Sequence, residues 1–294
     1  MKHVLSATCL IALIISSGCS KNKLPVPQDP ASSITTQANV GVCDYLQDET
    51  AIVAAGWTKT FDENFSSDLS KWTVWRGGAY NNELQMYQAP NLQVTGGLLL
   101  ITAKKETVTG PTTNFDATPK TFNYTSGRIE TNTNISASTK TPKVRIAARI
   151  KLPAGYGMWP AFWSYGDPWP TQGEIDCMEA RGQEPFKYQT NYFYGRRTNQ
   201  NVVKGAEGFI TSNVSLTDCW HVYEMIWTKD SLTFMLDGEI VKVNTGTNVT
   251  NLFGKTERIV LNLAVGGLFF SNFDPSQIVT GTMQVDYVKV FTSK

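Results

Sequence analysis

The residues best suited to chemistry in this chain lie in the segment Gly173-Glu-Ile-Asp-Cys-Met-Glu179, which holds three carboxylic acids. Side chains of a regular strand alternate between two faces, so Glu174 and Asp176 would share one face and Glu179 would point to the other. A carboxylate buried without a partner among apolar side chains is costly. One extra residue at Cys177 and Met178, a β-bulge, returns Glu179 to the face of the other acids. The sequence therefore predicts a bulged strand with all three acids on one face.

Three acids on one face repel one another and raise the pKa of at least one of them. A retaining glycosidase uses such a pair, one carboxyl ionised and one protonated, at a separation of about 5–5.5 Å. Glu174 and Glu179 are long enough to converge to that separation, with Asp176 between them to hydrogen-bond the ionised member. The alternatives are a solvated acidic face and a calcium site.

Aromatic residues directly precede the acids, in Gly157-Met-Trp-Pro-Ala-Phe-Trp163 and Asp167-Pro-Trp-Pro170. The flat apolar face of an indole suits a sugar ring as well as a protein core. We expect Trp159, Trp163 and Trp169 to form sugar-binding platforms beside the acids, and core packing is the alternative for each.

The chain from about Gly56 onward is typical of short strands separated by turn residues. The apolar or alternating runs that we assign to strands are 98–103, 144–152, 189–194, 222–227, 232–236, 258–263 and 283–291. Asp237-Gly238 after the fifth run predicts a hairpin turn. No segment keeps a period of about 3.6 residues over a helix-length window. The predicted fold is therefore a single all-β sandwich.

Composition narrows the function classes. The 294 residues carry a net charge of +1 with 17% charged residues, so no basic surface for nucleic acid is expected. The two His residues and the lack of a Cys-x-x-Cys motif argue against a zinc site and a His-based triad. Past the N-terminal segment the Cys residues are Cys43, Cys177 and Cys219, an odd number that leaves at least one unpaired. A disulfide between Cys43 and Cys219 is left open.

The N-terminus has the features of an export signal. A basic start precedes the apolar run 4–15, which is too short to span a bilayer. Ser16-Ser-Gly-Cys19 resembles a lipoprotein signal-peptidase site, although Ser16 replaces the usual aliphatic residue. We expect a signal peptide at 1–18, a lipidated Cys19 with a flexible Pro/Ser/Thr-rich tether at 19–42, and one catalytic domain at 43–294. The expected location is a bacterial outer membrane or cell surface, and an ordinary secretory signal is the alternative.

The acid segment and the blocks around it resemble glycoside hydrolase family 16, the laminarinase-like β-glycanases. Glu-Ile-Asp-x-x-Glu at 174–179 is similar to the bulged form of the family motif. Further similar blocks follow in order along the chain, at 61–65, 81–87, 124–129, 148–153, 262–267 and 286–290. The resemblance implies a concanavalin A-like β-sandwich jelly roll with an open cleft on the concave sheet, which suits cleavage inside a polysaccharide chain.

The resemblance also implies roles for single residues. Glu174 would be the nucleophile, Asp176 its partner and Glu179 the acid/base, so we expect a raised pKa for Glu179 and a lower one for Glu174. The residues expected to bind substrate are Asn82, Glu83, Trp159, Trp163, Trp169, Asn191 and Phe193. No cofactor is required for catalysis, and a structural calcium is expected near Glu63 and Asp286. We expect a monomer that touches the membrane only through its lipid anchor.

Two departures bear on the substrate. Laminarinases usually carry His-Tyr-Gly after the catalytic strand, whereas this chain has Phe193-Tyr-Gly195, and Gln189-Thr-Asn191 resembles branches that lack the bulge. The predicted function is a retaining endo-β-glycosidase acting on β-1,3- or mixed-linkage glucan. The first alternative is an endo-β-galactosidase of host or algal glycans, with Arg196 and Arg197 reading anionic groups. The second is a glycan-binding lipoprotein without catalysis.

Overall fold

The computed structural model describes residues 40–200, 202–205 and 208–294, which fall within one compact unit, Ala31–Lys294. The expected signal peptide, the lipidated Cys19 and most of the expected tether therefore lie outside the described residues. In the described part of the chain, no helix has the length and apolar character needed to cross a membrane.

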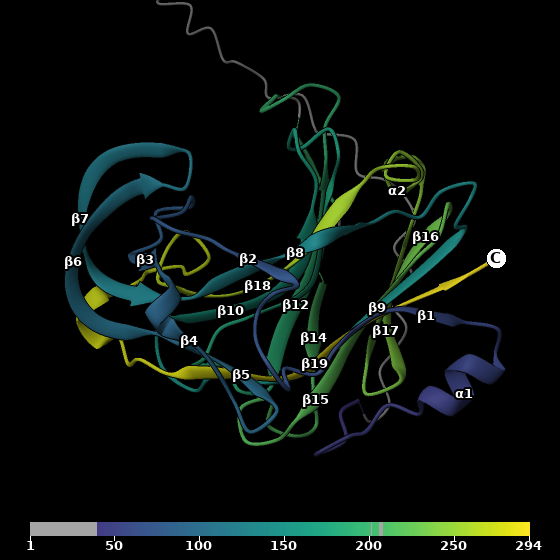
Figure 1. Ribbon diagram of the computed structural model, residues 1–294, viewed down its shortest axis with the longest axis horizontal. Helices are drawn as coiled ribbons and strands as arrows, with labels where there is room; N and C mark the ends of the chain where they lie inside the picture. The colour runs from purple at the N-terminus through teal and green to yellow at the C-terminus, as the bar shows by residue number, and fades with distance from the viewer. Residues whose placement is uncertain (1–39, 201, 206–207) are drawn as a thin grey trace, which may run out of the picture. The chain divides into compact units, whose positions relative to one another are not determined.

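Two antiparallel sheets stack into a sandwich (Figure 1), so the predicted all-β jelly roll is confirmed. The first sheet has the order β17 (Glu239–Thr245), β16 (Ser231–Leu236), β15 (His221–Trp227), β9 (Lys143–Lys151), β19 (Thr282–Ser293), β5 (Leu98–Thr102) and β4 (Leu92–Thr95), with β1 (Thr58–Glu63) also on β19. The second has the order β13 (Val203–Lys204), β12 (Lys187–Tyr194), β11 (Glu174–Ala180), β10 (Met158–Tyr165), β18 (Glu257–Val265), β8 (Arg128–Ile135) and β2 (Trp72–Val74), with β14 (Gly208–Thr211) on β12.

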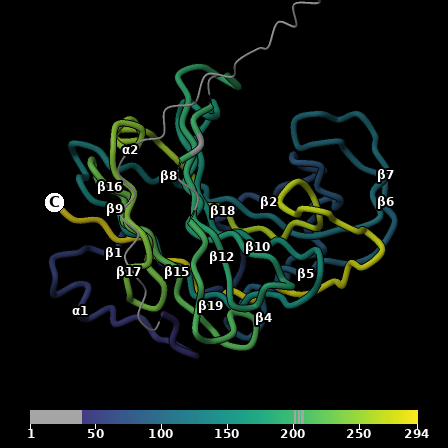
Figure 2. The backbone as a smooth tube through the Cα atoms, turned by 180° about the vertical axis from the view of Figure 1, so that it is seen from behind, coloured from purple at the N-terminus to yellow at the C-terminus, as the bar shows by residue number. Residues whose placement is uncertain are grey.

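A third, smaller sheet consists of β3 (Gln85–Tyr87), β7 (Asp116–Ser126) and β6 (Lys104–Thr113). Strands β6 and β7 form a long curved hairpin at the opposite end of this unit from α1 (Glu49–Ala54), as both views show (Figures 1 and 2). The other helical turns are α2 (Thr247–Thr250), η1 (Ala89–Asn91) and η2 (Pro275–Gln277).

All seven runs assigned to strands from the sequence are strands in the structure. The alternation of inward and outward side chains explains why these runs form strands. In β9, the inward residues Val144, Ile146, Ala148 and Ile150 enter the core between the two main sheets. The turn at Asp237 and Gly238 joins β16 to β17 with positive φ at both residues (53° and 83°), as the Asp-Gly pair predicts.

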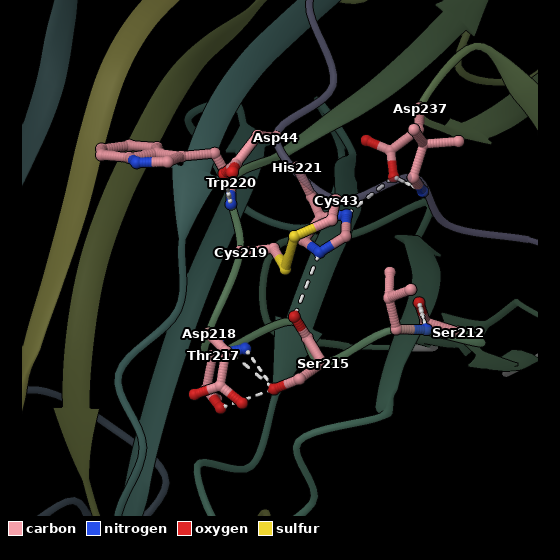
Figure 3. Close-up of a disulfide and its surroundings, with 12 residues drawn as sticks. Cys43, Asp44, Ser212, Ser215, Thr217, Asp218, Cys219, Trp220, His221 and Asp237 are labelled. Carbon is pink, nitrogen blue, oxygen red and sulfur yellow. Dashed lines mark hydrogen bonds and ion pairs between the residues drawn. A yellow bond between two sulfur atoms is a disulfide. The ribbon is translucent and has the colours of Figure 1, made fainter.

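A disulfide fixes the N-terminal end of the described chain (Figure 3). Cys43 and Cys219 are joined with 1.98 Å between the sulfurs, and Cys177 is a buried free thiol. Asp237 accepts hydrogen bonds from the backbone of Val42 (2.8 Å) and lies 2.7 Å from His221 Nδ1. Val40, three residues before the boundary expected at Cys43, is buried in the core.

Candidate active site

Strand β11 carries the acids and is bulged as the sequence predicts. Against β12, Asp176 stands opposite Asn191 and Glu179 opposite Gln189, so β11 has one residue more than its neighbour between these pairs. Cys177 and Met178, which form the bulge, both lie in the core cluster. Because two consecutive side chains turn inward, Glu179 returns to the outer face with the other acids.

The three acids line one cleft of about 630 Å³ on the outer face of the second sheet. Alternate residues of β10, beginning with Trp159 and ending with Tyr165, contribute its floor. Its walls come from loops and neighbouring strands. The larger lining side chains are Trp75, Tyr80, Asn81, Glu83, Tyr87, Phe115, Arg128, Trp159, Trp163, Tyr165, Asp167, Trp169, Phe193, Asn199 and Asn262. All three predicted Trp residues are therefore beside the acids.

Two of these Trp residues donate hydrogen bonds from their indole nitrogens to the carboxyl groups of the catalytic candidates. Trp159 Nε1 donates to Glu179 Oε1 at 3.0 Å, and Trp169 Nε1 donates to Glu174 Oε2 at 2.6 Å. Gln189 Nε2 makes a longer contact of 3.4 Å with Glu179 Oε2. Hydrogen bonds from rigid donors orient both carboxyl groups, a function of Trp159 and Trp169 that sequence reasoning missed.

The Glu174 carboxyl, expected to have the lower pKa of the two, itself has a raised pKa. Burial, and secondly the charge of Glu179, raise the pKa of the Glu174 carboxyl to about 8, while the Trp169 indole and Arg128 act in the opposite direction. A proton shared by two interacting carboxyls belongs to the pair rather than to one residue. The pair therefore keeps one proton at neutral pH, which is the charge state that a nucleophile and a general acid need together.

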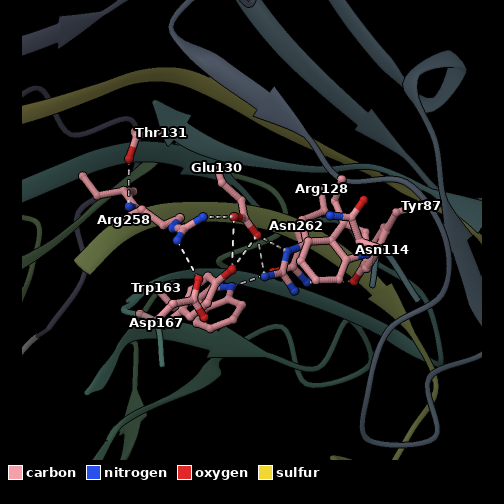
Figure 4. A network of polar contacts seen from close by, with 12 residues as sticks. Tyr87, Asn114, Arg128, Glu130, Thr131, Trp163, Asp167, Arg258 and Asn262 are labelled. Carbon is pink, nitrogen blue, oxygen red and sulfur yellow. Dashed lines mark hydrogen bonds and ion pairs between the residues drawn. The ribbon is translucent and has the colours of Figure 1, made fainter. Parts of the chain in front are cut away.

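A buried ionic network supports the cleft floor (Figure 4). Arg128 donates to Glu130 from Nε at 3.0 Å and from Nη2 at 2.6 Å, and its guanidinium lies 4.1 Å from the centre of the Trp75 ring. Glu130 also accepts from the Tyr165 hydroxyl and lies 3.5 Å from Arg258. Sequence reasoning missed Arg128 and Glu130 as site residues, although they lie in or directly after a block quoted for its family resemblance.

The two predicted residues of the loop before β3 differ in position. Glu83 lines the cleft and accepts from the Tyr87 hydroxyl at 3.1 Å, and burial raises the pKa of its carboxyl. Asn82 is exposed and does not line the cleft. Its neighbour Asn81 does, because both asparagines have positive φ (59° and 56°) and the chain turns sharply between them.

Of the two predicted β12 residues, only Phe193 borders the cleft. Phe193 stands opposite Glu174, and its ring centroid is 6.4 Å from that of Trp169. Asn191 is 1% exposed and is not among the lining residues. Its carboxamide oxygen accepts from the backbone N–H of Tyr192 at 2.9 Å, so that oxygen is engaged within the strand.

The carboxylates expected near a calcium ion have separate protein partners. Glu63 accepts from the Phe65 backbone at 2.8 Å and from the Trp72 indole at 3.2 Å, while Asp286 pairs with Arg149 at 2.7 Å. Within residues 40–200, 202–205 and 208–294, no group of three or more His, Cys, Asp or Glu side chains could hold a metal ion. The calcium site stays a prediction, and no step of the chemistry depends on it.

Comparison with known proteins agrees with this geometry. Residues 80–289 match the family described as Glycosyl hydrolases family 16. The glucan endo-1,3-beta-glucosidase of Cryptopygus antarcticus is 31% identical over 82% of this chain and 94% of that protein. The glucan endo-1,3-beta-glucosidase A1 of Niallia circulans is 29% identical over 90% of this chain but only 42% of its own length. The endo-beta-1,3-glucanase structure from Pyrococcus furiosus superposes with a TM-score of 0.68 and 31% identity, covering 81% of this chain and 95% of that one.

Proposed function

This chain belongs to glycosyl hydrolases family 16, and on that premise we propose that it is a retaining endo-β-glycosidase that cleaves internal bonds of β-1,3- or mixed-linkage glucan. The observation that carries the proposal is the common exposure of Glu174 and Glu179 to one cleft, each bonded to an indole. Similarity to glucan endo-1,3-beta-glucosidases over most of the chain supports the choice of glucan.

In the proposed reaction, ionised Glu174 attacks the anomeric carbon while Glu179 protonates the oxygen of the leaving sugar. Glu179 then takes a proton from water, which hydrolyses the covalent glycosyl-enzyme. The productive form has the proton of the pair on Glu179. The hydrogen bond from Trp169 and the charge of Arg128 favour that form, because both stabilise an ionised Glu174. We assign Asp176, which is buried on the same strand face, to positioning Glu174.

The charges around the cleft favour a neutral polysaccharide. Five carboxylic acids line the cleft, Glu83, Asp167, Glu174, Asp176 and Glu179, and the Glu174–Glu179 pair still carries one negative charge when it holds a single proton. Arg128 is the one cation among the described lining residues, and it is paired with Glu130. A sulfated or uronic acid chain would meet repulsion here. Arg196 and Arg197, proposed above as readers of anionic groups, are exposed and outside the lining.

A neutral galactose-containing glycan is the second candidate substrate. Phe193 faces the cleft opposite Glu174, at the position where the sequence departs from laminarinases. An apolar ring beside the nucleophile changes which sugar hydroxyls find hydrogen-bond partners.

A panel of polysaccharides tests the proposal. Laminarin, mixed-linkage glucan, and neutral and sulfated galactans are digested, and the products are identified by mass and linkage analysis. We expect glucan oligosaccharides and no products from sulfated chains. Galactose-terminated products alone would establish the second candidate. Retention of a glycan without any product would instead support a binding protein.

We further propose that the protein is exported and anchored through Cys19. The Ser16-Ser-Gly-Cys19 motif supports this, as does the Cys43–Cys219 disulfide, since disulfides persist outside the reducing cytoplasm. Labelling with a radioactive fatty acid should mark the wild type and not Cys19→Ala, and a Cys19→Ala protein that is still labelled would refute the anchor.

A further inference from the structure

Two exposed aromatic rings border the cleft far from the acids in the sequence. Phe115 is 72% exposed and Tyr80 is 56% exposed, yet both line the same cleft as Glu174 and Glu179. Leaving such large apolar side chains in water forgoes the stabilisation that their burial would give. A single exposed apolar side chain is common, but two that converge on a functional cleft form a candidate contact surface.

Close backbone contact fixes the hairpin that carries Phe115. The tip of β6–β7 packs on Gly77 and Gly78, and the Gly78 N–H donates to Pro111 O at 3.0 Å. A Cβ on Gly78 would lie 2.4 Å from Thr112 O, a distance that backbone atoms do not tolerate. Only glycine permits this approach, so the tip has one well-defined position relative to the loop after β2.

The Phe115 ring packs against a buried partner. Its centroid is 5.4 Å from that of Trp75, with the two planes at 90°. Trp75 is buried, and its Nε1 donates to Gly78 O at 3.0 Å. Phe115 is thus exposed but held in place, and little conformational entropy would be lost when a ligand covers it.

The same contacts connect this ring to the catalytic strand. From Phe115 the contacts run through Trp75 to Arg128, whose guanidinium lies 5.0 Å from the ring of Trp163. Trp163 stands opposite Asp176 in the register of β10 and β11. The floor from the hairpin tip to the acids is therefore continuous, with indole and phenyl rings along it.

We propose that Phe115 and Tyr80 form a distal subsite that binds outer sugar units of the glycan held in the cleft. The proposal rests on the proposed function, because its occupant is a continuation of the same neutral β-linked chain. Flat apolar faces of pyranose rings would pack on the two aromatic rings, while hydroxyl groups remain in water. The β6–β7 hairpin then determines how long a chain the enzyme prefers.

The test compares oligosaccharides of increasing length. The ratio of KM for short laminari-oligosaccharides to KM for long ones measures the gain from the distal subsite. We expect Phe115→Ala and Tyr80→Ala each to reduce that ratio about tenfold, a loss of roughly one ring contact. Phe115→Trp should restore it. Phe186→Ala is the matched control, since Phe186 is 47% exposed and lies outside the cleft lining.

The outcomes separate this subsite from a merely structural role. An equal loss at every chain length, or an unchanged ratio in both variants, would overturn it. Gel retardation by laminarin and by neutral galactan, using Glu174→Gln with and without Phe115→Ala, gives a readout independent of hydrolysis. Weaker retardation of the double variant would support the subsite even if the wild type cleaved no glucan. Absence of glucan cleavage would contradict only the proposed function. Equal retardation would reject the subsite.

Discussion

The Trp169 indole donates a 2.6 Å hydrogen bond to the Glu174 carboxylate, five residues along the chain. The bond favours the ionised form of Glu174, so it offsets part of the rise in pKa that burial causes. Trp169→Phe should raise that pKa, shift the proton of the pair from Glu179 toward Glu174, and lower kcat/KM about 10- to 100-fold, the value of a hydrogen bond to a charged group.

The alkaline limb of the pH–rate profile should move upward in Trp169→Phe, because the last proton of the pair is held more tightly. Trp220→Phe is the control, because Trp220 lies near the disulfide (Figure 3) and is not among the residues that line the cleft. A Trp169→Phe enzyme whose limb stays in place would show that the indole does not act on Glu174.

Substrates with different leaving groups can distinguish the nucleophile from the general acid. Glu179→Ala should lower kcat on polysaccharide about 10²–10⁴-fold, the usual contribution of a general acid. On an aryl glycoside with an acidic phenol the loss should be much smaller, since that leaving group needs no proton. Glu174→Ala should abolish activity on both substrates. Equal losses on both substrates in Glu179→Ala would reverse or reject the assignment.

Glu174 should make stability depend on pH. Its folded-state pKa is raised to about 8, so its contribution to stability is fully present below its ordinary pKa and is lost as pH rises through 8. Glu174→Gln carries no ionisable group, and its Tm advantage over the wild type should grow between pH 5 and pH 8, by about 2–4 °C for each kcal/mol.

Thermal unfolding followed by circular dichroism at each pH measures this difference. The exposed Glu239→Gln variant should show no such pH trend. A constant difference between Glu174→Gln and wild type would contradict a raised pKa.

The ion pair below the cleft should matter most when it is broken from one side. Arg128→Met leaves the Glu130 carboxylate buried without its main partner and should cost about 3–5 kcal/mol of unfolding free energy. Arg258→Met removes a partner that is 34% exposed and 3.5 Å away, and should cost far less. Denaturant titrations compare the two, and similar costs would refute the dominance of the Arg128–Glu130 pair.

The position of the bulge could be predicted because the alternation of side chains along a strand leaves few positions for an extra residue. Burial of Glu179 is costly, so the extra residue had to lie between Asp176 and Glu179, and the register confirms it. The strands were equally predictable wherever apolar side chains alternate, as in β9. Both inferences use only the period of a strand and the cost of a buried charge.

Other features depend on contacts between distant segments and were not predictable. The β6–β7 hairpin was missed because residues 104–126 hold few apolar side chains, and Pro111 and Pro119 interrupt the pattern. The raised pKa of Glu174 follows first from burial and secondly from the charge of Glu179, and the depth of burial cannot be derived from spacing. Asn82 and Asn191 were expected to bind substrate by analogy, whereas Asn82 is exposed outside the lining and Asn191 is buried.

The Cys43–Cys219 disulfide also determines how mechanical force enters the domain. It joins residues 176 positions apart and fastens the chain next to β15, which pairs with β9 and β16 inside the first sheet. A pull on the chain before Cys43 is passed through a covalent bond to β15, and α1 and β1 lie within the closed loop, outside that path. If the proposed anchor at Cys19 holds the protein, tension on the N-terminal side therefore reaches the first sheet through the disulfide.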